Sequence, residues 1–204
     1  MKKPKLRELA EAIKSLIKGP YTSKFPFAPH TPPQNFRGAP KYSEEGCIGC
    51  TGCSNVCPPN AIEFIDDLSK TPPTRKMIVH HDICIFCGQC EAFCTTKEDS
   101  PPGIKLSMDY DLAVFDRKDA VSSAEKELAI CEVCGDPITA KAHIDWIAKR
   151  LGPLAFSNPT LFMSRLKELD LIDDNITEVV KDLTRADRMK IICAKCRRKT
   201  TLEK

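Results

Sequence analysis

Cys47-Ile48-Gly49-Cys50-Thr51-Gly52-Cys53-Ser54-Asn55-Val56-Cys57-Pro58 is the stretch that decides the fold of this 204-residue chain. Its cysteines follow the spacing C-x2-C-x2-C-x3-C. The same spacing recurs 37 residues later, in the run formed by Cys84, Cys87, Cys90 and Cys94. An internal repeat of this kind predicts two half-domains of similar structure.

The spacing predicts ligands of iron–sulfur clusters, because it is the run of bacterial ferredoxins. Three cysteines at i, i+3 and i+6 can surround one [4Fe–4S] cube, while the fourth points out of the loop towards the other cube. Ligation is then crossed between the two runs. We expect the first [4Fe–4S] cluster on Cys47, Cys50, Cys53 and Cys94, and the second on Cys84, Cys87, Cys90 and Cys57.

Two other uses of these cysteines are disfavoured. Disulfide bridges are typical of secreted proteins, and the sequence has no secretory signal. Structural zinc sites favour paired C-x-x-C knuckles over a four-cysteine run used twice. We expect the dry shell of the clusters to come from Ile48, Val56, Ile85 and Phe93. His80 and His81, just before the second run, are either surface residues at a strand end or groups that couple proton and electron movement.

The remaining cysteines form two C-x-x-C pairs, Cys131 with Cys134 and Cys193 with Cys196. Four thiolates make a closed structural zinc site, and Gly135 after the first pair is typical of a zinc knuckle. The long separation of the pairs is unusual for a zinc ribbon. A single iron of the rubredoxin type would use the same ligands, but we favour Zn²⁺ because a structural site needs no redox change.

The charge of the chain argues against a nucleic-acid-binding protein. The formal net charge is +3 with neutral cysteines. Two oxidised clusters and one zinc bring about +6 against −12 from twelve thiolates, so the loaded protein lies near −3. Basic residues remain concentrated at the two termini. A zinc-ribbon protein that binds nucleic acid through Arg197, Arg198 and Lys199 is the alternative from another class.

The N-terminal 45 residues have a different character. Leu6, Leu9, Ile13 and Ile17 share one face of a predicted amphipathic helix over residues 6–18. This helix packs either on the protein's own core or on a membrane surface or partner groove. From Pro20 to Gly46 the sequence is rich in proline and aromatic residues, which excludes a regular helix or strand and predicts an extended arm ordered by another surface. No run is apolar enough to predict a membrane span.

Short strands are expected over residues 61–65, 77–80 and 104–108, closing a small α+β sandwich around the clusters. Beyond about residue 117 the sequence is charged and helix-forming. One helix is expected over residues 139–151 with Ile144, Ile147 and Leu151 inward, and a second starts with Asn158 as N-cap. A third is expected near Asn175. The predicted domains are 1–45, 46–116 and 117–204. The fold class is α+β: a two-cluster ferredoxin-type domain with an N-terminal docking segment and a helical, zinc-ribbon-like extension.

Several motifs resemble one protein family. They are Asn35-Phe36-Arg37-Gly38-Ala39-Pro40, the two cysteine runs, and Ile104-Lys105-Leu106-Ser107 leading to Tyr110-Asp111-Leu112-Ala113. Together they are similar to the ferredoxin-like subunit of complex I and of its relatives in membrane-bound [NiFe] hydrogenases, formate hydrogenlyase and sulfur-reducing complexes. The C-terminal cysteine pairs resemble the formate hydrogenlyase branch more than the complex I subunit. Thr95, in place of a proline after the second run, departs from the repeat and begins an inserted loop.

The resemblance implies a relay without catalysis of its own. Electrons would enter from a donor such as reduced ferredoxin, pass through two clusters, and leave to a small hydrogenase-like iron–sulfur subunit of an ion-pumping complex. It also implies a peripheral position on the cytoplasmic face of the membrane, with the helix and the proline-rich arm as docking elements. A free soluble ferredoxin is the alternative. The arm argues against it, because a diffusing carrier has no use for a segment that only an apposed surface orders.

Overall fold

The computed structural model describes residues 5–19, 22–172 and 189–202, in two compact units that divide between Phe36 and Arg37. The first unit contains helix α1 (Leu6–Lys18), as the apolar periodicity predicts. Glu8 accepts a hydrogen bond from the Lys5 backbone N–H and so caps the first turn. Every residue of α1 is exposed. Within the described residues, no helix has the length and apolar character that crossing a membrane requires.

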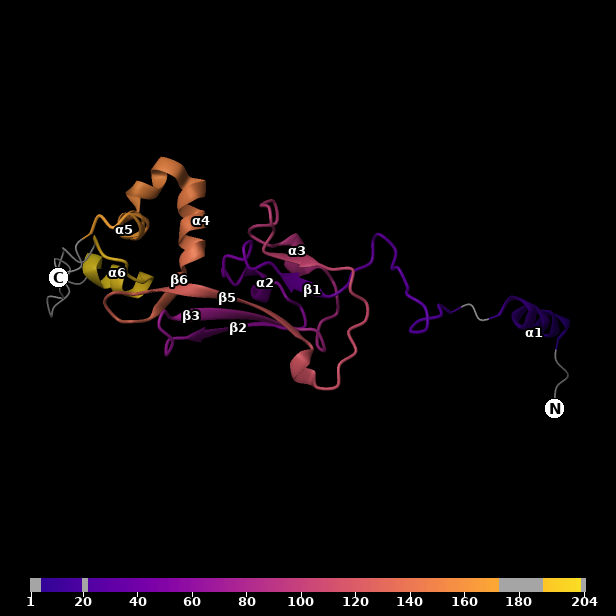
Figure 1. Ribbon diagram of the computed structural model, residues 1–204. Helices are drawn as coiled ribbons and strands as arrows, with labels where there is room; N and C mark the ends of the chain where they lie inside the picture. Colours follow the sequence, from indigo (N-terminus) through magenta and orange to yellow (C-terminus); the bar gives the residue numbers. More distant parts are fainter. Residues whose placement is uncertain (1–4, 20–21, 173–188, 203–204) are drawn as a thin grey trace. The chain divides into compact units, whose positions relative to one another are not determined.

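The second unit is built on two antiparallel sheets (Figure 1). One is the pair β1 (Pro40–Tyr42) and β4 (Ile104–Leu106), and the other has the order β2 (Ile62–Asp67), β3 (Thr74–His80), β5 (Val121–Ile130) and β6 (Pro137–Ala140). Helix α2 (Gly52–Asn55) follows the first cysteine loop and α3 (Gln89–Ala92) the second. Each half therefore runs strand, cysteine loop, short helix and strand, as the repeat predicts.

The core between these elements is small and contains the cysteines themselves. Met77, Val79 and Ala124 from the long sheet pack with Ile62 and Ile104 around Cys47, Cys53 and Cys90. Alternate residues of β3 are buried, which places Arg75, Met77 and Val79 on the face towards the cysteine loops. The core thus covers the cysteines on the side of the long sheet.

Two expectations about strands are wrong. Residues 121–130, expected in helix-forming sequence, form strand β5, which pairs with β3 from Val121 to Glu127. Pairing with an exposed strand edge outweighs the weak helical preference of this charged segment. The proline-rich arm, expected to lack strands, contains β1 at its end. Pro40 occupies the first position of that strand, where proline is tolerated.

The C-terminal helices partly match expectation. Helix α4 (Lys141–Leu151) buries Ile144 and Ala148, and Ile147 packs on the same cluster. Leu151 was expected inward but is 41% exposed, because Ala148 and Ala155 occupy that side of the core. The Asn158 side chain caps α5 (Pro159–Glu168) as predicted, accepting hydrogen bonds from the Thr160 and Leu161 backbones. A 3₁₀ turn (Gly152–Ser157) joins α4 to α5, and α6 (Ala194–Leu202) follows the last cysteines. The helix expected near Asn175 lies outside the described residues.

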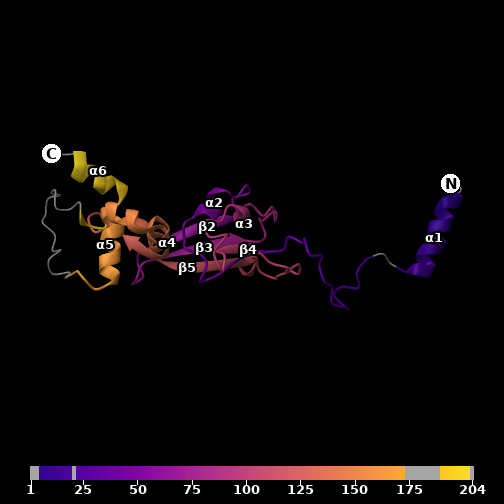
Figure 2. The same ribbon diagram turned by 90° about the horizontal axis from the view of Figure 1, so that it is seen from above.

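Helix α4 lies beside the long sheet, where it packs against strand β5 (Figure 2). The Trp146 indole N–H donates to the Asp99 carboxylate at 2.7 Å, and Arg150 stacks on the Trp146 ring. Asp99 belongs to the loop inserted after the second cysteine run. Strands β5 and β6 therefore extend the sheet, and α4 holds this loop in place. The domain limits 1–45, 46–116 and 117–204 stay a prediction.

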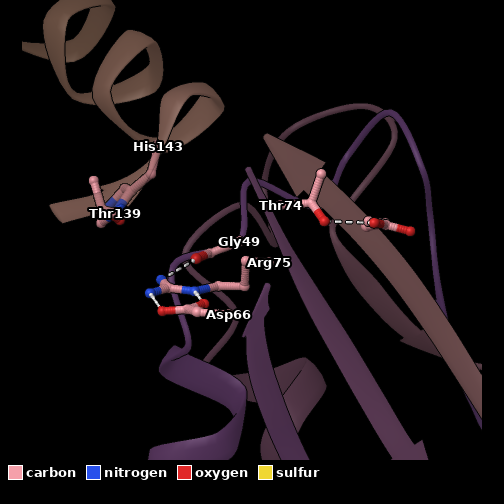
Figure 3. Close-up of polar contacts among 7 residues, drawn as sticks. Gly49, Asp66, Thr74, Arg75, Thr139 and His143 are labelled. Carbon is pink, nitrogen blue, oxygen red and sulfur yellow. Dashed lines mark hydrogen bonds and ion pairs between the residues drawn. The ribbon is translucent and has the colours of Figure 1, made fainter. Parts of the chain in front are cut away.

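A buried ion pair connects the long sheet to the first cysteine loop (Figure 3). The Arg75 guanidinium binds the Asp66 carboxylate with distances of 2.6 and 2.8 Å, and it donates to the Gly49 carbonyl at 3.1 Å. The Phe64 ring lies beneath it, 5.0 Å from ring centroid to guanidinium carbon. Arg75 is 8% exposed. Removing one partner of such a pair leaves the other charge buried without compensation.

Replacing Arg75 with leucine is therefore expected to lower the free energy of unfolding by about 3 kcal/mol. Urea unfolding followed by far-ultraviolet circular dichroism measures the change. Lys70→Leu is the control, because the Lys70–Glu125 ion pair lies at the surface and should matter little. Equal losses in the two variants would contradict the structural role given to Arg75.

Candidate cluster-binding sites

Eight cysteines line two separate cavities in the ferredoxin-type half. The first cavity is lined by Cys47, Cys50, Cys53 and Cys94. The second is lined by Cys57, Cys84, Cys87 and Cys90. The fourth cysteine of each run therefore lies at the cavity of the other run.

The backbone of the two cysteine loops repeats the same unusual conformation. Gly49 and Phe86, at equivalent positions, both have positive φ, at 65° and 52°. Thr51 and Gly88, also equivalent, have φ of 63° and 79°. Left-handed backbone is costly for threonine and phenylalanine, and such strain concentrates at functional sites. The turns bring backbone N–H groups towards the sulfurs, as in the 3.4 Å bond from the Phe86 N–H to the Cys84 sulfur.

Burial disfavours the ionised form of four of these thiols. It raises the pKa of the Cys53 thiol to about 12 and that of Cys90 to about 11, and it also raises the pKa of Cys47 and Cys84. A thiolate is the form that binds a metal, so occupancy needs a positive charge that offsets the desolvation. The irons of a [4Fe–4S] cluster supply that charge, and four thiols at each cavity match its ligand number.

The apolar shell of the two cavities differs from expectation. Ile48 is 8% exposed and lines the first cavity, as predicted, whereas the half-buried Val56 is not among the lining residues of either cavity. Ile85 lines the second cavity but is 60% exposed, and Phe93 is 61% exposed. Both residues lie on the second loop, whereas the first loop lies against the end of strand β6. At Gly49 an added Cβ would lie 2.8 Å from the Ala140 side chain, which shows how closely the two approach.

The two histidines before the second run have different surroundings. The Nε2 atom of His80 lies 2.9 Å from the Glu63 carboxylate on the exposed face of the sheet. This contact fits a surface residue at a strand end. The His81 ring is half-buried; burial, followed by the nearby Lys41 charge, lowers its pKa. The role of either histidine in proton coupling stays a hypothesis.

The C-terminal cysteines converge on a third site. The sulfurs of Cys131, Cys134, Cys193 and Cys196 all lie within 4.8 Å of one another. Burial raises the pKa of Cys131, but backbone N–H groups of Cys134, Cys193 and Val133 outweigh it, and the pKa falls to about 7. Burial raises the pKa of Cys196 to about 12. Four close sulfurs with N–H donors suit a tetrahedral divalent cation.

Two side chains near the first cavity were not predicted as site residues. The Tyr42 hydroxyl lies 3.3 Å from the Cys53 sulfur, and the Thr95 hydroxyl lies 3.2 Å from the Cys50 sulfur. Thr95 was noticeable in the sequence only as a departure from the repeat. Tyr42 gave no signal, because it lies five residues before the run and reaches its partner through the fold.

Comparison with known proteins agrees with these sites. The family model of the 4Fe-4S dicluster domain matches residues 46–97. Formate hydrogenlyase subunit 6 of Escherichia coli is 38% identical over 135 residues, which are 66% of this chain and 71% of that protein. NAD(P)H-quinone oxidoreductase subunit I of Gloeobacter violaceus is 29% identical over 101 residues, 48% of this chain and 46% of the relative.

A solved structure of the membrane-bound sulfane sulfur reductase, an archaeal respiratory membrane complex, contains a chain 27% identical to this one. The similarity covers 59% of this chain and 61% of that chain, with a TM-score of 0.38. The match to the Escherichia coli protein extends well beyond the dicluster segment and covers more than two thirds of that protein's length. The family resemblance carried by the cysteine runs is thereby confirmed: this chain belongs to the family of ferredoxin-like 4Fe–4S subunits that includes formate hydrogenlyase subunit 6.

Proposed function

We propose that the protein relays electrons through two [4Fe–4S] clusters within a membrane-bound, ion-pumping oxidoreductase complex related to complex I. The observation that carries the proposal is the pair of four-cysteine cavities in one small core. Bound clusters accept and release electrons one at a time at low potential. The chain has no need of a substrate pocket for this role, and chemistry takes place on other subunits.

The ligand sets of the two clusters are crossed between the runs. Cys94 joins Cys47, Cys50 and Cys53 at the first cluster, and Cys57 joins Cys84, Cys87 and Cys90 at the second. The composition of the two cavities supports this assignment. The x3 spacing before the fourth cysteine, and the turn at Pro58, carry that cysteine away from its own loop.

The C-terminal site holds one structural Zn²⁺ on Cys131, Cys134, Cys193 and Cys196. Support comes from the mutual distances of their sulfurs and from the N–H donors that lower the pKa of Cys131. A closed site of four thiolates without a free position is typical of structural zinc. Metal analysis distinguishes this zinc from a single iron bound to the same four cysteines.

The N-terminal unit supports a peripheral position of the protein at the membrane. The apolar face of α1 is exposed, with Leu6, Leu16 and Ile17 among its residues, and Lys14 and Lys18 flank it. An amphipathic basic helix suits an anionic membrane surface or a partner groove. Helix and arm dock the protein peripherally on the cytoplasmic face, next to a small hydrogenase-like iron–sulfur subunit. The electron donor is an external reduced ferredoxin.

The metal content tests the cofactors directly. We expect about eight irons, eight sulfides and one zinc per chain in protein purified without oxygen. Cys134→Ala should remove the zinc and leave the iron content unchanged, because that site is separate from the two cavities. Four irons per chain, or nine irons without zinc, would contradict the assignment.

The crossed ligation is tested by four single variants. Cys57→Ala is expected to damage the cluster that Cys87→Ala also damages, and Cys94→Ala the one that Cys50→Ala damages. We expect the loss of one ligand to leave a [3Fe–4S] cluster, which electron paramagnetic resonance detects in the oxidised state. If Cys57→Ala instead matched Cys50→Ala, ligation would be local to each run.

Deleting residues 1–18 tests the docking helix. We expect the truncated protein to leave the membrane fraction while retaining both clusters, because no residue of α1 is buried and all cluster cysteines lie in the other unit. Fractionation of cell membranes together with iron analysis measures both effects. Loss of the clusters would make the helix part of the core, and retention in the membrane would contradict its role as the anchor.

A further inference from the structure

The first cavity differs from the second in the donors that reach its cysteine sulfurs. The Tyr42 hydroxyl is 3.3 Å from the Cys53 sulfur, and the Thr95 hydroxyl is 3.2 Å from the Cys50 sulfur. Tyr42 is placed by strand β1, and Thr95 by the turn after the second cysteine run. Both residues line the first cavity. Each hydroxyl therefore faces the sulfur of one cysteine ligand of the same proposed cluster.

The direction of these two hydrogen bonds follows from the proposed function. A thiolate bound to iron carries no proton, so in each contact the hydroxyl must donate and the sulfur accept. Thr96 does not act in the same way, although its hydroxyl lies 3.5 Å from the Cys94 sulfur. It donates its only proton to the Gly46 carbonyl, 3.0 Å away. Tyr42 and Thr95 are thus the hydroxyl donors to sulfur among the described residues.

At the second cavity the donors are backbone groups. The Ala61 N–H donates to the Cys57 sulfur at 3.2 Å, and the Phe86 N–H to the Cys84 sulfur at 3.4 Å. In the described part of the chain, no serine, threonine or tyrosine lines this cavity. Backbone N–H donors also serve the first cavity, where the Gly49 N–H lowers the pKa of Cys47. The hydroxyls are an addition to a pattern that both cavities share.

The internal repeat shows that the two cavities differ in side chains at equivalent positions and share their backbone frame. The 37-residue offset between the runs carries Tyr42 onto Val79 and Thr95 onto Pro58. Tyr42 pairs with Ile104 between β1 and β4, and Val79 pairs with Ile62 between β3 and β2, so the backbone positions correspond. Valine has no donor, and proline has neither a hydroxyl nor an N–H. The second cavity therefore has the same frame without the two hydroxyls.

Nearby positive charges do not produce the same asymmetry. The Lys126 ammonium lowers the pKa of Cys47 at the first cavity. The Arg37 guanidinium donates to the Cys87 carbonyl, 3.2 Å away, at the second. Arg75 at the first loop is neutralised by Asp66. Each loop therefore has a basic side chain nearby, and the two cavities differ in the hydroxyl donors that reach their cysteine sulfurs.

We propose that the Tyr42 and Thr95 hydroxyls raise the reduction potential of the cluster in the first cavity by donating hydrogen bonds to the sulfurs of its cysteine ligands. Reduction by a one-electron, low-potential donor adds one negative charge to the cluster and its thiolates. Hydrogen bonds to the ligand sulfurs stabilise this added charge, and such bonds are among the factors that set cluster potentials. The inference rests on the proposed function, because it requires a cluster in the first cavity.

The test is a redox titration of the intact chain, followed by electron paramagnetic resonance. Tyr42→Phe and Thr95→Val each remove one hydroxyl and keep the side-chain shape. Each is expected to shift the potential of the first cluster to a more negative value, with a larger shift in the double variant. The potential of the second cluster should stay unchanged. The signals are assigned with Cys50→Ala and Cys87→Ala, which damage the two clusters separately.

Two matched controls separate the hydrogen bond from a general structural effect. Thr95→Ser keeps the hydroxyl and should keep the wild-type potential. Ser54→Ala removes a hydroxyl one residue after Cys53, but that hydroxyl donates to the Ile62 carbonyl at 2.8 Å, so no shift is expected. Thr95 is exposed. Thr95→Val and Thr95→Ser therefore suffice if Tyr42→Phe disturbs the core.

Iron and sulfide are measured in every sample before titration. Unchanged potentials in Tyr42→Phe and Thr95→Val with both clusters present would overturn the proposal, as would equal shifts in both clusters or a shift in Thr95→Ser equal to that in Thr95→Val. A wild-type protein without a cluster in the first cavity would contradict the proposed function itself, and iron content distinguishes that failure from the others.

Discussion

Placing four cysteine sulfurs together inside a small core is unfavourable unless a cation compensates for it, and the rest of the structure depends on this constraint. Burial, together with the neighbouring cysteines, raises the pKa of Cys53 and Cys90 to about 12 and about 11. Without metal the cavities would contain protonated thiols that pack poorly and make few hydrogen bonds. The cysteines are themselves part of the core, because Cys47, Cys53 and Cys90 pack with Met77, Val79 and Ile104.

Residues 121–151 pack with the ferredoxin-type half as well as with helix α5. Strand β5 widens the sheet behind the cysteine loops, and Ala140 at the end of β6 lies against Gly49 in the first loop. Trp146 on α4 binds Asp99 in the inserted loop. These contacts hold β5, β6 and α4 against the first loop and the inserted loop, whereas Ile85 and Phe93 on the second loop are exposed.

The sequence predicted the parts that depend on local spacing. The three short strands and the Asn158 cap follow from short-range patterns, and the structure agrees with them, while the crossed ligation stays a prediction. Strand β5 could not be predicted, because its polar residues alternate weakly and its strand state depends on pairing with β3. Leu151 was misplaced because a helical period does not reveal where the core ends. Tyr42 and Arg75 were missed since each reaches a cysteine loop through tertiary contact, far from any motif.

A relay with two identical halves would have two clusters of similar potential, and an electron would be shared between them without preference. The repeat in this chain is close enough to create that situation: the loops share their spacing, their left-handed residues and the N–H donor to the first cysteine of each run. The departures from symmetry then gain importance. Tyr42 in place of valine and Thr95 in place of proline both line the first cavity, although Thr95 follows the second run. In the proposed crossed topology, substitutions in both halves therefore adjust a single cluster. A chain with local ligation would have needed both hydroxyls within one run to produce the same effect.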